Sequence, residues 1–495
     1  MPVKRPSRRR FLGQASCSAV GATSLFSTLL NMRCSSALAT PQRITPAGPL
    51  PGDDYKALIC LFLAGGNDSF NMMVPRGPAE YAEYAAVRGD LALPRESLLP
   101  ISPATGDGRE YGVHPGMPEV QQLFADGKLS FLANVGSLVE PTDKAGVISG
   151  SAQLPLGLYS HSDQITHWQT SVPDQRTSLG WAGRTADLLR SSNQNDTVSM
   201  NISLGGTNIF QSGTQVVPYS IGSTGNGSVG IEGYGGSDPF AQLRTAAINS
   251  ILDREYQNLF VDTFAKTAKG AIDAHLLFSG AVAGAPPLTT VCAPGGVSQS
   301  FKLVARTIAA RRTLGVRRQT FFVLFGGWDH HDEVINAQGA MLPMVSKGLS
   351  ELYGALTELG VQDDVVTFTA SDFGRTLTSN GRGSDHAWGG NHIVMGGPVV
   401  GGDIYGEYPQ LYADNELDTG RGRLIPTTSC DEYFAELALW LGVAPSDLAT
   451  VLPNIGRFYT PGSGAPVGFL GGGGASIFSD GFESGNVSAW STSVG

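Results

Sequence analysis

Cysteine is scarce in this sequence. Of five cysteines among 495 residues, Cys17 and Cys34 lie within residues 1–39, which leaves Cys60, Cys292 and Cys430 widely spaced along the rest of the chain. One pair of the three could form a disulfide, but three is an odd number and no C-x-x-C motif is present. These counts exclude a disulfide-rich scaffold and a cysteine zinc site.

Apolar runs long enough to span a membrane are also missing, and no Lys/Arg-rich run follows residue 39. The weakly apolar stretch 15–30 contains glycine, serine and threonine, and it is too short and too polar for a permanent membrane helix. Residues 1–39 hold six basic and no acidic side chains, so the remainder has 27 basic and 43 acidic side chains, a net charge of −16. Such an acidic surface repels phosphate backbones, and we therefore expect no nucleic-acid partner and no permanent membrane span.

The N-terminus carries the pattern of an export signal. Paired arginines stand in Ser7-Arg8-Arg9-Arg10-Phe11-Leu12, where they precede a large apolar pair, as twin-arginine signals require. Ala37-Leu38-Ala39 offers a small-x-small cleavage site. The sequence therefore predicts a signal peptide over residues 1–39, the twin-arginine translocase as a partner during export, and a periplasmic, secreted or cell-surface location.

Four apolar runs predict buried strands. They alternate with helical periodicity such as that of Leu342 to Leu359, which indicates βα units and a mainly parallel sheet. We expect one α/β domain over residues 40–460, with three layers and helices on both faces of the sheet. The four runs are Tyr55 to Ala64, Leu129 to Val135, Thr320 to Phe325 and Val365 to Ala370.

Glycine, by contrast, is abundant, with 65 residues, and it marks the irregular parts of the chain. Residues 212–237 are rich in Gly, Ser, Thr and Asn and predict a surface loop, because no strand feeds their GxGxxG spacing and no helix follows directly. Residues from about 238 to 280 look helical and predict an insertion. Residues 461–495 begin with a Gly/Pro-rich stretch, which predicts a linker followed by a C-terminal tail.

Potential metal ligands follow three of the predicted strands. Asp68 follows the first, Asp329-His330-His331 the third and Asp372 the fourth, and a later segment contains Asp385-His386 and His392. Function gathers beyond the carboxyl ends of strands in such sheets. An aspartate at a strand end is often only the N-cap of the next helix, but together these segments predict a mixed O/N site for a divalent metal, zinc or manganese, with one or two ions.

Five segments carry a family resemblance. They are LFLAGGNDSFNMMVP, LYSHSDQITHWQ, FGGWDHHDE, TASDFGRT and GSDHAWGGNH. They resemble a twin-arginine-exported family known as domain of unknown function 1501, over nearly the whole chain from residue 40 to about residue 460. That family is placed with the alkaline phosphatase and sulfatase superfamily, so the resemblance implies an alkaline phosphatase-like fold and its two-metal arrangement.

The resemblance implies roles for particular residues. Asp68 and Asp372 would bind one ion, and Asp329 and His331 would bind the second, together with His386 or His392. Ser160 or Ser162, which precede or begin a helix-like segment, would be the nucleophile, since a helix N-terminus favours an anionic ester. Arg375 or His161 would neutralise charge on the transferred group.

Two function classes remain open on this sequence. The first is an exported metal-dependent hydrolase of phosphate or related anionic esters, with a small-molecule or polymer ester as substrate. The second is a non-catalytic exported binding or cell-surface protein that keeps the fold, favoured by Phe373, which stands where the superfamily commonly has a histidine or asparagine. The sulfatase C-x-P-x-R signature, a G-x-S-x-G elbow and an H-E-x-x-H motif are all absent.

Overall fold

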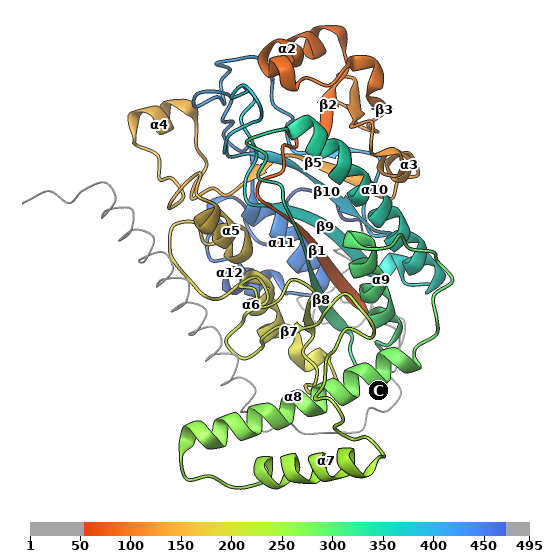
Figure 1. The fold of residues 1–495 in the computed structure, drawn as a ribbon. Coiled ribbons are helices and arrows are strands. Elements are labelled where there is room, and N and C mark those ends of the chain that lie inside the picture. The colour runs from red at the N-terminus through yellow and green to blue at the C-terminus, as the bar shows by residue number, and fades with distance from the viewer. Residues whose placement is uncertain (1–53, 472–495) are drawn as a thin grey trace, which may run out of the picture. The chain divides into compact units, whose positions relative to one another are not determined.

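The computed structural model describes residues 54–471, which divide into two compact units (Figure 1). The larger unit comprises Lys56–Gln175, Leu288–Lys302 and the chain from Val323 onward. The smaller unit comprises Arg176–Pro287 and Leu303–Phe322, together with residues 54 and 55. The expected signal peptide and residues 472–495 of the expected tail lie outside the described residues.

A sheet with strand order β11-β5-β10-β9-β1 forms the centre of the larger unit. Its two longest strands, β1 and β5, are buried along nearly their whole length, as their continuous apolar sequences predict. A short additional strand, β12 (Thr428–Ser429), pairs with β5. The main strands are β1 (Lys56–Ala64), β5 (Leu129–Gly136), β9 (Val365–Ser371), β10 (Gly390–Met395) and β11 (Ile404–Tyr405).

The strand directions bring several chain ends to one edge of this sheet. β1 pairs with β9 in parallel, and β10 runs antiparallel to both β9 and β5. The carboxyl ends of β1, β5 and β9 therefore lie at the same edge as the amino end of β10. The backbone N–H of Trp328 donates to the carbonyl of Ala64 at 3.1 Å, so the segment after β8 also reaches this edge.

Helices and a second, small sheet complete the larger unit. The small sheet is antiparallel, with strand order β2-β4-β3, from Met73–Pro75, Tyr111–Val113 and Leu99–Ile101. The helices are α2 (Pro78–Arg88), α3 (Pro118–Ala125), α4 (Lys144–Ser149), α5 (His161–Thr170), α10 (Val334–Glu358), α11 (Cys430–Leu441) and α12 (Leu448–Val451). Short 3₁₀ turns join several of these elements.

Local sequence explains where individual helices begin. α11 starts with a capping box, in which the Ser429 hydroxyl accepts from the N–H of Glu432 and the Glu432 carboxylate accepts from the N–H of Ser429. α10 starts eight residues before the predicted Leu342 and continues through Pro343. Its packing against α3, where the Ser346 hydroxyl accepts from the N–H of Val120 at 3.1 Å, offsets the backbone hydrogen bond that the proline removes.

The smaller unit contains its own short parallel ladder. β8 (Arg318–Gly326) begins here, and its first half pairs with β6 (Asn201–Ser203), which pairs with β7 (Tyr219–Ser220). Helix α6 (Trp181–Leu189) precedes β6, and α9 (Gly296–Ala309) passes from the larger unit into this one. Apart from β7, residues 212–237 form no strand or helix, and residues 238–280 fold into α7 (Pro239–Leu252) and most of α8 (Leu259–Gly284).

The start of the expected linker packs against the larger unit. Phe469 is fully buried, and the N–H groups of Val467, Gly468 and Leu470 donate to the carboxylate of Glu436 at 2.6–2.8 Å. The N–H of Gly471 donates to the carbonyl of Pro398. The described structure of this unit therefore continues past residue 460, because one buried carboxylate satisfies three backbone donors of a glycine-rich segment.

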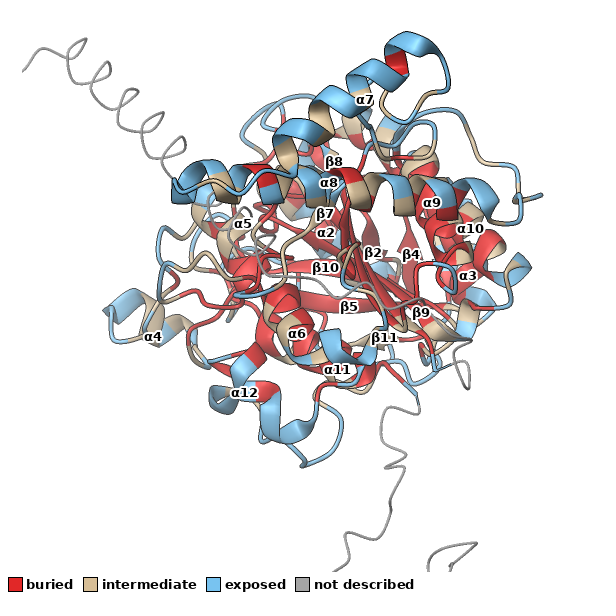
Figure 2. Cartoon of the chain, turned by 90° about the horizontal axis from the view of Figure 1, so that it is seen from below, coloured by how far each residue is buried: buried red, intermediate tan, exposed pale blue. Residues whose placement is uncertain are grey.

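The burial pattern agrees with a mixed α/β fold around a mostly parallel sheet, as the sequence predicts. Figure 2 shows the strands almost entirely buried, while α7 is largely exposed. Large apolar side chains fill the interior of the larger unit, among them Trp328 and Trp388. None of the helices within residues 54–471 combines the length and the apolar character that crossing a membrane requires.

Candidate metal centre

The loops at the shared sheet edge are held together by one buried guanidinium. Arg375, just after β9, is fully buried and donates to the carbonyls of Gly65, Gly66, Ser384 and Trp328 and to the carboxylate of Asp329. We expected Arg375 to contact the transferred group of a substrate. Its donors are instead directed to backbone carbonyls and to Asp329, so it positions the loops and does not reach solvent.

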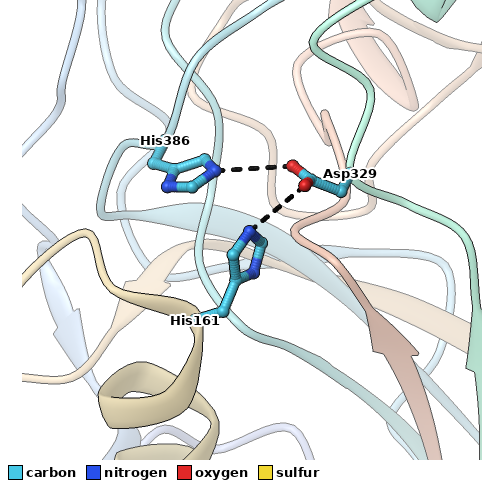
Figure 3. A group of neighbouring side chains, drawn as sticks. All are labelled: His161, Asp329 and His386. Carbon is cyan, nitrogen blue, oxygen red and sulfur yellow. Dashed lines mark ion pairs between the residues drawn. The ribbon is translucent and has the colours of Figure 1, made fainter. Parts of the chain in front are cut away.

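Three histidines surround the carboxylate of Asp329. His161 from α5 places Nε2 3.4 Å from Oδ2, and His386 places Nε2 3.4 Å from Oδ1 (Figure 3). His331 places its Nε2 3.2 Å from Oδ1 as well. Potential ligand atoms of His161, Asp329 and His386 all lie within 4.8 Å of one another. The structure thus brings together residues that are far apart in the sequence.

The opposite ring nitrogen of each histidine has an acceptor. His161 Nδ1 lies 2.6 Å from Asp372 Oδ2, His386 Nδ1 lies 2.8 Å from the carbonyl oxygen of Tyr159, and His331 Nδ1 lies 3.1 Å from Asp385 Oδ1. A carbonyl can only accept, so Nδ1 of His386 carries the proton, and Nδ1 of His161 and of His331 carries it when the facing carboxylate is ionised. In the neutral rings, all three Nε2 lone pairs therefore face Asp329.

This arrangement of lone pairs is one that a cation satisfies. The Nε2 atoms of His331 and His386 are only 2.8 Å apart, and His161 Nε2 is buried without a hydrogen-bond partner. Two lone pairs repel each other at this distance, so either an additional proton or a cation must lie between Nε2 of His331 and Nε2 of His386. Ligand atoms around a tetrahedral zinc ion are about 3.3 Å apart for bonds of about 2.0–2.1 Å, close to the observed separations from Asp329.

Local electrostatics lower the pKa of Asp329 and of His386. Burial raises the pKa of Asp329, but the hydrogen bond and charge of Arg375 outweigh it, and the net pKa is lowered. Burial lowers the pKa of His386, and the positive charge of Arg375 acts in the same direction, against the hydrogen bond to Tyr159. An ionised carboxylate and a neutral imidazole are the forms that bind a divalent ion.

The other two predicted aspartate ligands have different partners. Asp68 is fully buried, and its Oδ2 accepts from Arg88 Nη2 and from the Ser384 hydroxyl, both at 2.7 Å. Asp372 accepts from the N–H of Gly65 at 2.9 Å and from His161, and burial raises its pKa in spite of these bonds. The described partner of the Asp68 carboxylate is therefore a buried arginine, and that of the Asp372 carboxylate is a histidine.

Phe373 fills space beside these groups. Its ring centroid lies 4.8 Å from that of His161 and 4.5 Å from that of His386. An apolar ring thus stands next to Asp372, where the resemblance implies a polar metal ligand. Among the described residues, the group of histidine and aspartate ligand atoms that could hold an ion lies at Asp329.

His392 was the alternative to His386 as the late histidine ligand, and the structure places it elsewhere. It lies in β10, only 4% of its surface is exposed, and its ring packs against Trp168 and Tyr433, with centroids 4.6 and 6.1 Å away. Its position inside the strand directs it into the apolar layer beneath α5 and α11. His386, in the loop before β10, is the histidine that meets Asp329.

The buried state of His392 predicts a loss of stability in acid. Burial lowers its pKa from 6.5 to about 3. As the pH falls below 6.5, the unfolded chain takes up a proton that the folded state resists, so stability falls by about 1.4 kcal/mol per pH unit. His392→Phe keeps the ring contacts, and between pH 7 and pH 5 it should lose about 2 kcal/mol less stability than the unmodified protein. Urea unfolding measures both values, and equal losses would contradict the prediction.

The two candidate nucleophiles lie at the start of α5. Ser160 is the N-cap residue, although its side chain makes no capping hydrogen bond, and Ser162 is in the first turn. Their hydroxyl oxygens are 3.1 Å apart. Ser162 is exposed, whereas Ser160 is partly buried and directly precedes His161. Both serines are therefore sequence neighbours of His161.

Sequence reasoning missed several outer partners of the centre. Asp385 orients His331, the Tyr159 carbonyl orients His386, and Arg421 Nη1 pairs with Asp385 Oδ2 at 2.6 Å. A backbone carbonyl leaves no sequence signal. Asp385, in contrast, directly precedes the expected ligand His386 in the sequence, and this position could have identified it as a partner of the centre.

We compared the chain with curated proteins and with solved structures. No curated protein matches the sequence. Two solved structures described as crystal structures of Ps i-CgsB, one in complex with k-i-k-neocarrahexaose, align with 81% and 82% of this chain and with 72% and 77% of theirs. They are 11% and 10% identical in sequence, with TM-scores of 0.30 and 0.31, which do not identify a shared fold.

A family match covers the part of the chain that carries most of the centre. It spans residues 287–420, which contain Asp329, His331 and His386, whereas His161 lies outside it. The matching model is that of the family described as "Protein of unknown function (DUF1501)", to which this part of the chain is similar.

Proposed function

We propose that this protein is a metal-dependent hydrolase of phosphate or related anionic esters, with an alkaline phosphatase-like fold. The observation that carries the proposal is the convergence of three histidine Nε2 atoms on Asp329. Their other ring nitrogens are bound by Asp372, Asp385 and a backbone carbonyl, the outer support that metal-binding histidines characteristically have. The class of substrate follows from the family resemblance.

The centre is open enough for catalysis. About half of the Asp329 side chain, 44% of that of His331 and 32% of that of His161 are exposed to solvent. Catalytic zinc sites keep a position open for water or substrate, whereas structural sites are closed by protein ligands. Zinc or manganese suits this set of imidazole and carboxylate ligands.

The proposed function assigns different roles to the residues of the centre. Asp329, His161 and His386 would hold the ion, with His331 as a fourth ligand or as an exchangeable partner. The bound ion supplies Lewis-acid polarisation of an ester oxygen and activation of a nucleophile. Asp372 keeps the proton on His161 Nδ1, and Arg375 holds the loops in place. Ser160 or Ser162 would be the nucleophile.

Elemental analysis combined with an activity panel tests this function. We expect about one equivalent of zinc or manganese per chain, because Arg88 already neutralises Asp68. Hydrolysis of a chromogenic phosphomonoester, phosphodiester or sulfate ester should stop on chelation and return when the metal is restored. A protein that binds neither metal and hydrolyses none of the three esters would refute the proposal.

A non-catalytic binding protein is the alternative. Phe373 beside the centre and the arginine-paired Asp68 favour it, because both remove groups that a two-metal hydrolase uses. Bound metal with full four-fold protein ligation and no turnover of any ester would identify this alternative. Spectroscopy of the cobalt-substituted protein distinguishes a closed site from one with an exchangeable water.

We further propose that the protein is exported by the twin-arginine translocase to the periplasm or cell surface. The proposal depends on Arg8, Arg9 and the apolar residues that follow them. Arg8→Lys combined with Arg9→Lys should retain the protein in the cytoplasm, whereas Arg5→Lys should not. Cell fractionation measures this, and export of the double variant at the normal level would contradict it.

A further inference from the structure

An anionic substrate at this centre needs a positive group that Arg375 does not supply. Arg375 is fully buried, and its donors are used by backbone carbonyls and Asp329. The other side chains of the centre offer a carboxylate and imidazole lone pairs. Among the described residues, three further arginines belong to the loops around the centre, namely Arg382, Arg421 and Arg423. Arg382 is 73% exposed and pairs with Asp332.

Arg421 is linked to the centre through two consecutive contacts. Its Nη1 lies 2.6 Å from Asp385 Oδ2, and Asp385 Oδ1 lies 3.1 Å from His331 Nδ1. The Arg421 side chain is 46% exposed. Within the described part of the chain, its Nε and Nη2 donors have no assigned acceptor. The guanidinium is therefore joined to His331 through Asp385, with part of the side chain exposed.

A rigid hairpin loop holds Arg421 in an uncommon backbone conformation. Its φ is +63°, in the left-handed region, which costs about 1 kcal/mol for a residue with a side chain. The Asp418 carboxylate accepts from the N–H groups of Gly420 and Gly422, both at 2.7 Å. The Thr378 hydroxyl donates to the Arg421 carbonyl at 3.0 Å. These bonds fix the direction in which Arg421 leaves the backbone.

Arg423 approaches the same region two residues later. Its Nε donates to the His386 carbonyl at 3.1 Å, and its guanidinium lies 5.1 Å from the centre of the Tyr159 ring. Tyr159 is the residue whose carbonyl orients His386. The two Nη groups of Arg423 have no acceptor among residues 54–471. Two partly exposed guanidiniums thus flank the segment that carries His386.

We propose that Arg421 and Arg423 bind the anionic group of the substrate, a tetrahedral oxyanion of the phosphoryl or sulfuryl type. Guanidinium groups match such oxyanions with paired N–H donors. The inference rests on the proposed function, to which it adds the residues that recognise the substrate. They are substrate-binding residues, and Arg375 is a positioning residue.

Titration calorimetry with inorganic phosphate, sulfate and acetate tests the pair, in both the metal-loaded and the metal-free protein. Arg421→Gln and Arg423→Gln should each weaken phosphate binding by about 10-fold or more, the loss expected when a charge-assisted hydrogen bond is removed. Lys144→Gln is the matched control, because it removes one positive charge from an exposed ion pair with Asp414. Comparison of phosphate with sulfate separates the two oxyanions, and acetate reports on unspecific charge attraction.

The outcomes separate this inference from the proposed function. Phosphate or sulfate affinity that falls in both arginine variants, with zinc affinity unchanged, supports the pair. Affinities equal to that of the Lys144→Gln control, or no binding of either oxyanion by the unmodified protein, overturn it while the metal centre stands. Loss of zinc binding in Arg421→Gln overturns it as well, since Arg421 would then position Asp385 and His331. If the unmodified protein binds no metal, the proposed function fails. The titration of the metal-free protein with phosphate then still shows whether Arg421 and Arg423 bind the oxyanion.

Discussion

Asp329→Asn is expected to weaken the binding of zinc or manganese by at least about 100-fold, the upper end of the loss caused by removing an outer partner of a metal ligand. Asp329 is the group on which the three histidine nitrogens converge, and the amide lacks its negative charge. Hydrolysis should fall in parallel with metal content. Calorimetric titration with each metal measures the affinity directly.

The matched control is Asp332→Asn. Asp332 lies three residues further along, is about half exposed, and pairs with Arg382, outside the centre. It should bind metal like the unmodified protein. Because Asp329 also accepts from Arg375, thermal unfolding of each variant shows whether the loop remains folded. A folded Asp329→Asn protein that binds metal as tightly as the control would remove Asp329 from the centre.

Arg88→Met is expected to reduce the free energy of unfolding by about 3–5 kcal/mol, the cost of leaving one member of a buried ion pair without its partner. The side chains of Arg88 and Asp68 are both fully buried, 2.7 Å apart. Arg88 also donates to the carbonyl of Thr376 at 3.0 Å. Methionine fills similar volume but leaves the carboxylate of Asp68 with the Ser384 hydroxyl alone.

Two comparisons isolate the buried charge as the cause. Adding Asp68→Asn to Arg88→Met should recover part of the lost stability, because the amide is neutral. Arg382→Met breaks the exposed pair with Asp332 and should cost no more than about 1 kcal/mol. Urea unfolding of the four proteins gives the free energies. An Arg88→Met loss no greater than that of Arg382→Met would show that the buried pair contributes little.

These two variants also address how many ions the centre holds. Asp68 would be a metal ligand in the two-metal arrangement that the family resemblance implies, yet Arg88 stands beside its carboxylate. The guanidinium supplies, without a metal, the positive charge that the buried carboxylate needs. Arg88, at the end of α2, is thus the described partner of Asp68.

The sequence by itself determined the strands and the loops that carry the chemistry. The apolar runs that form β1, β5 and β9 are continuous, so burial on both faces follows from local composition. The equally apolar run of β8 is buried only as far as Val323, and Leu324 is 45% exposed. Parallel strands end at a common edge, which is why Asp329 and His331 could be expected to meet a histidine from a later segment. The local sequence likewise predicted helical structure at α5 and in residues 238–280.

Only the tertiary structure decided which charged groups became partners. Arg88 is twenty residues from Asp68 and lies on a helix whose sequence shows nothing of that pairing. His161 and Asp372 are 211 residues apart, and their contact at 2.6 Å depends on how α5 packs at the sheet edge. Local sequence fixes where a strand ends, because burial is a property of consecutive residues. The choice between a metal, an arginine and a histidine as the partner of a carboxylate depends on side-chain directions that only the packed fold sets.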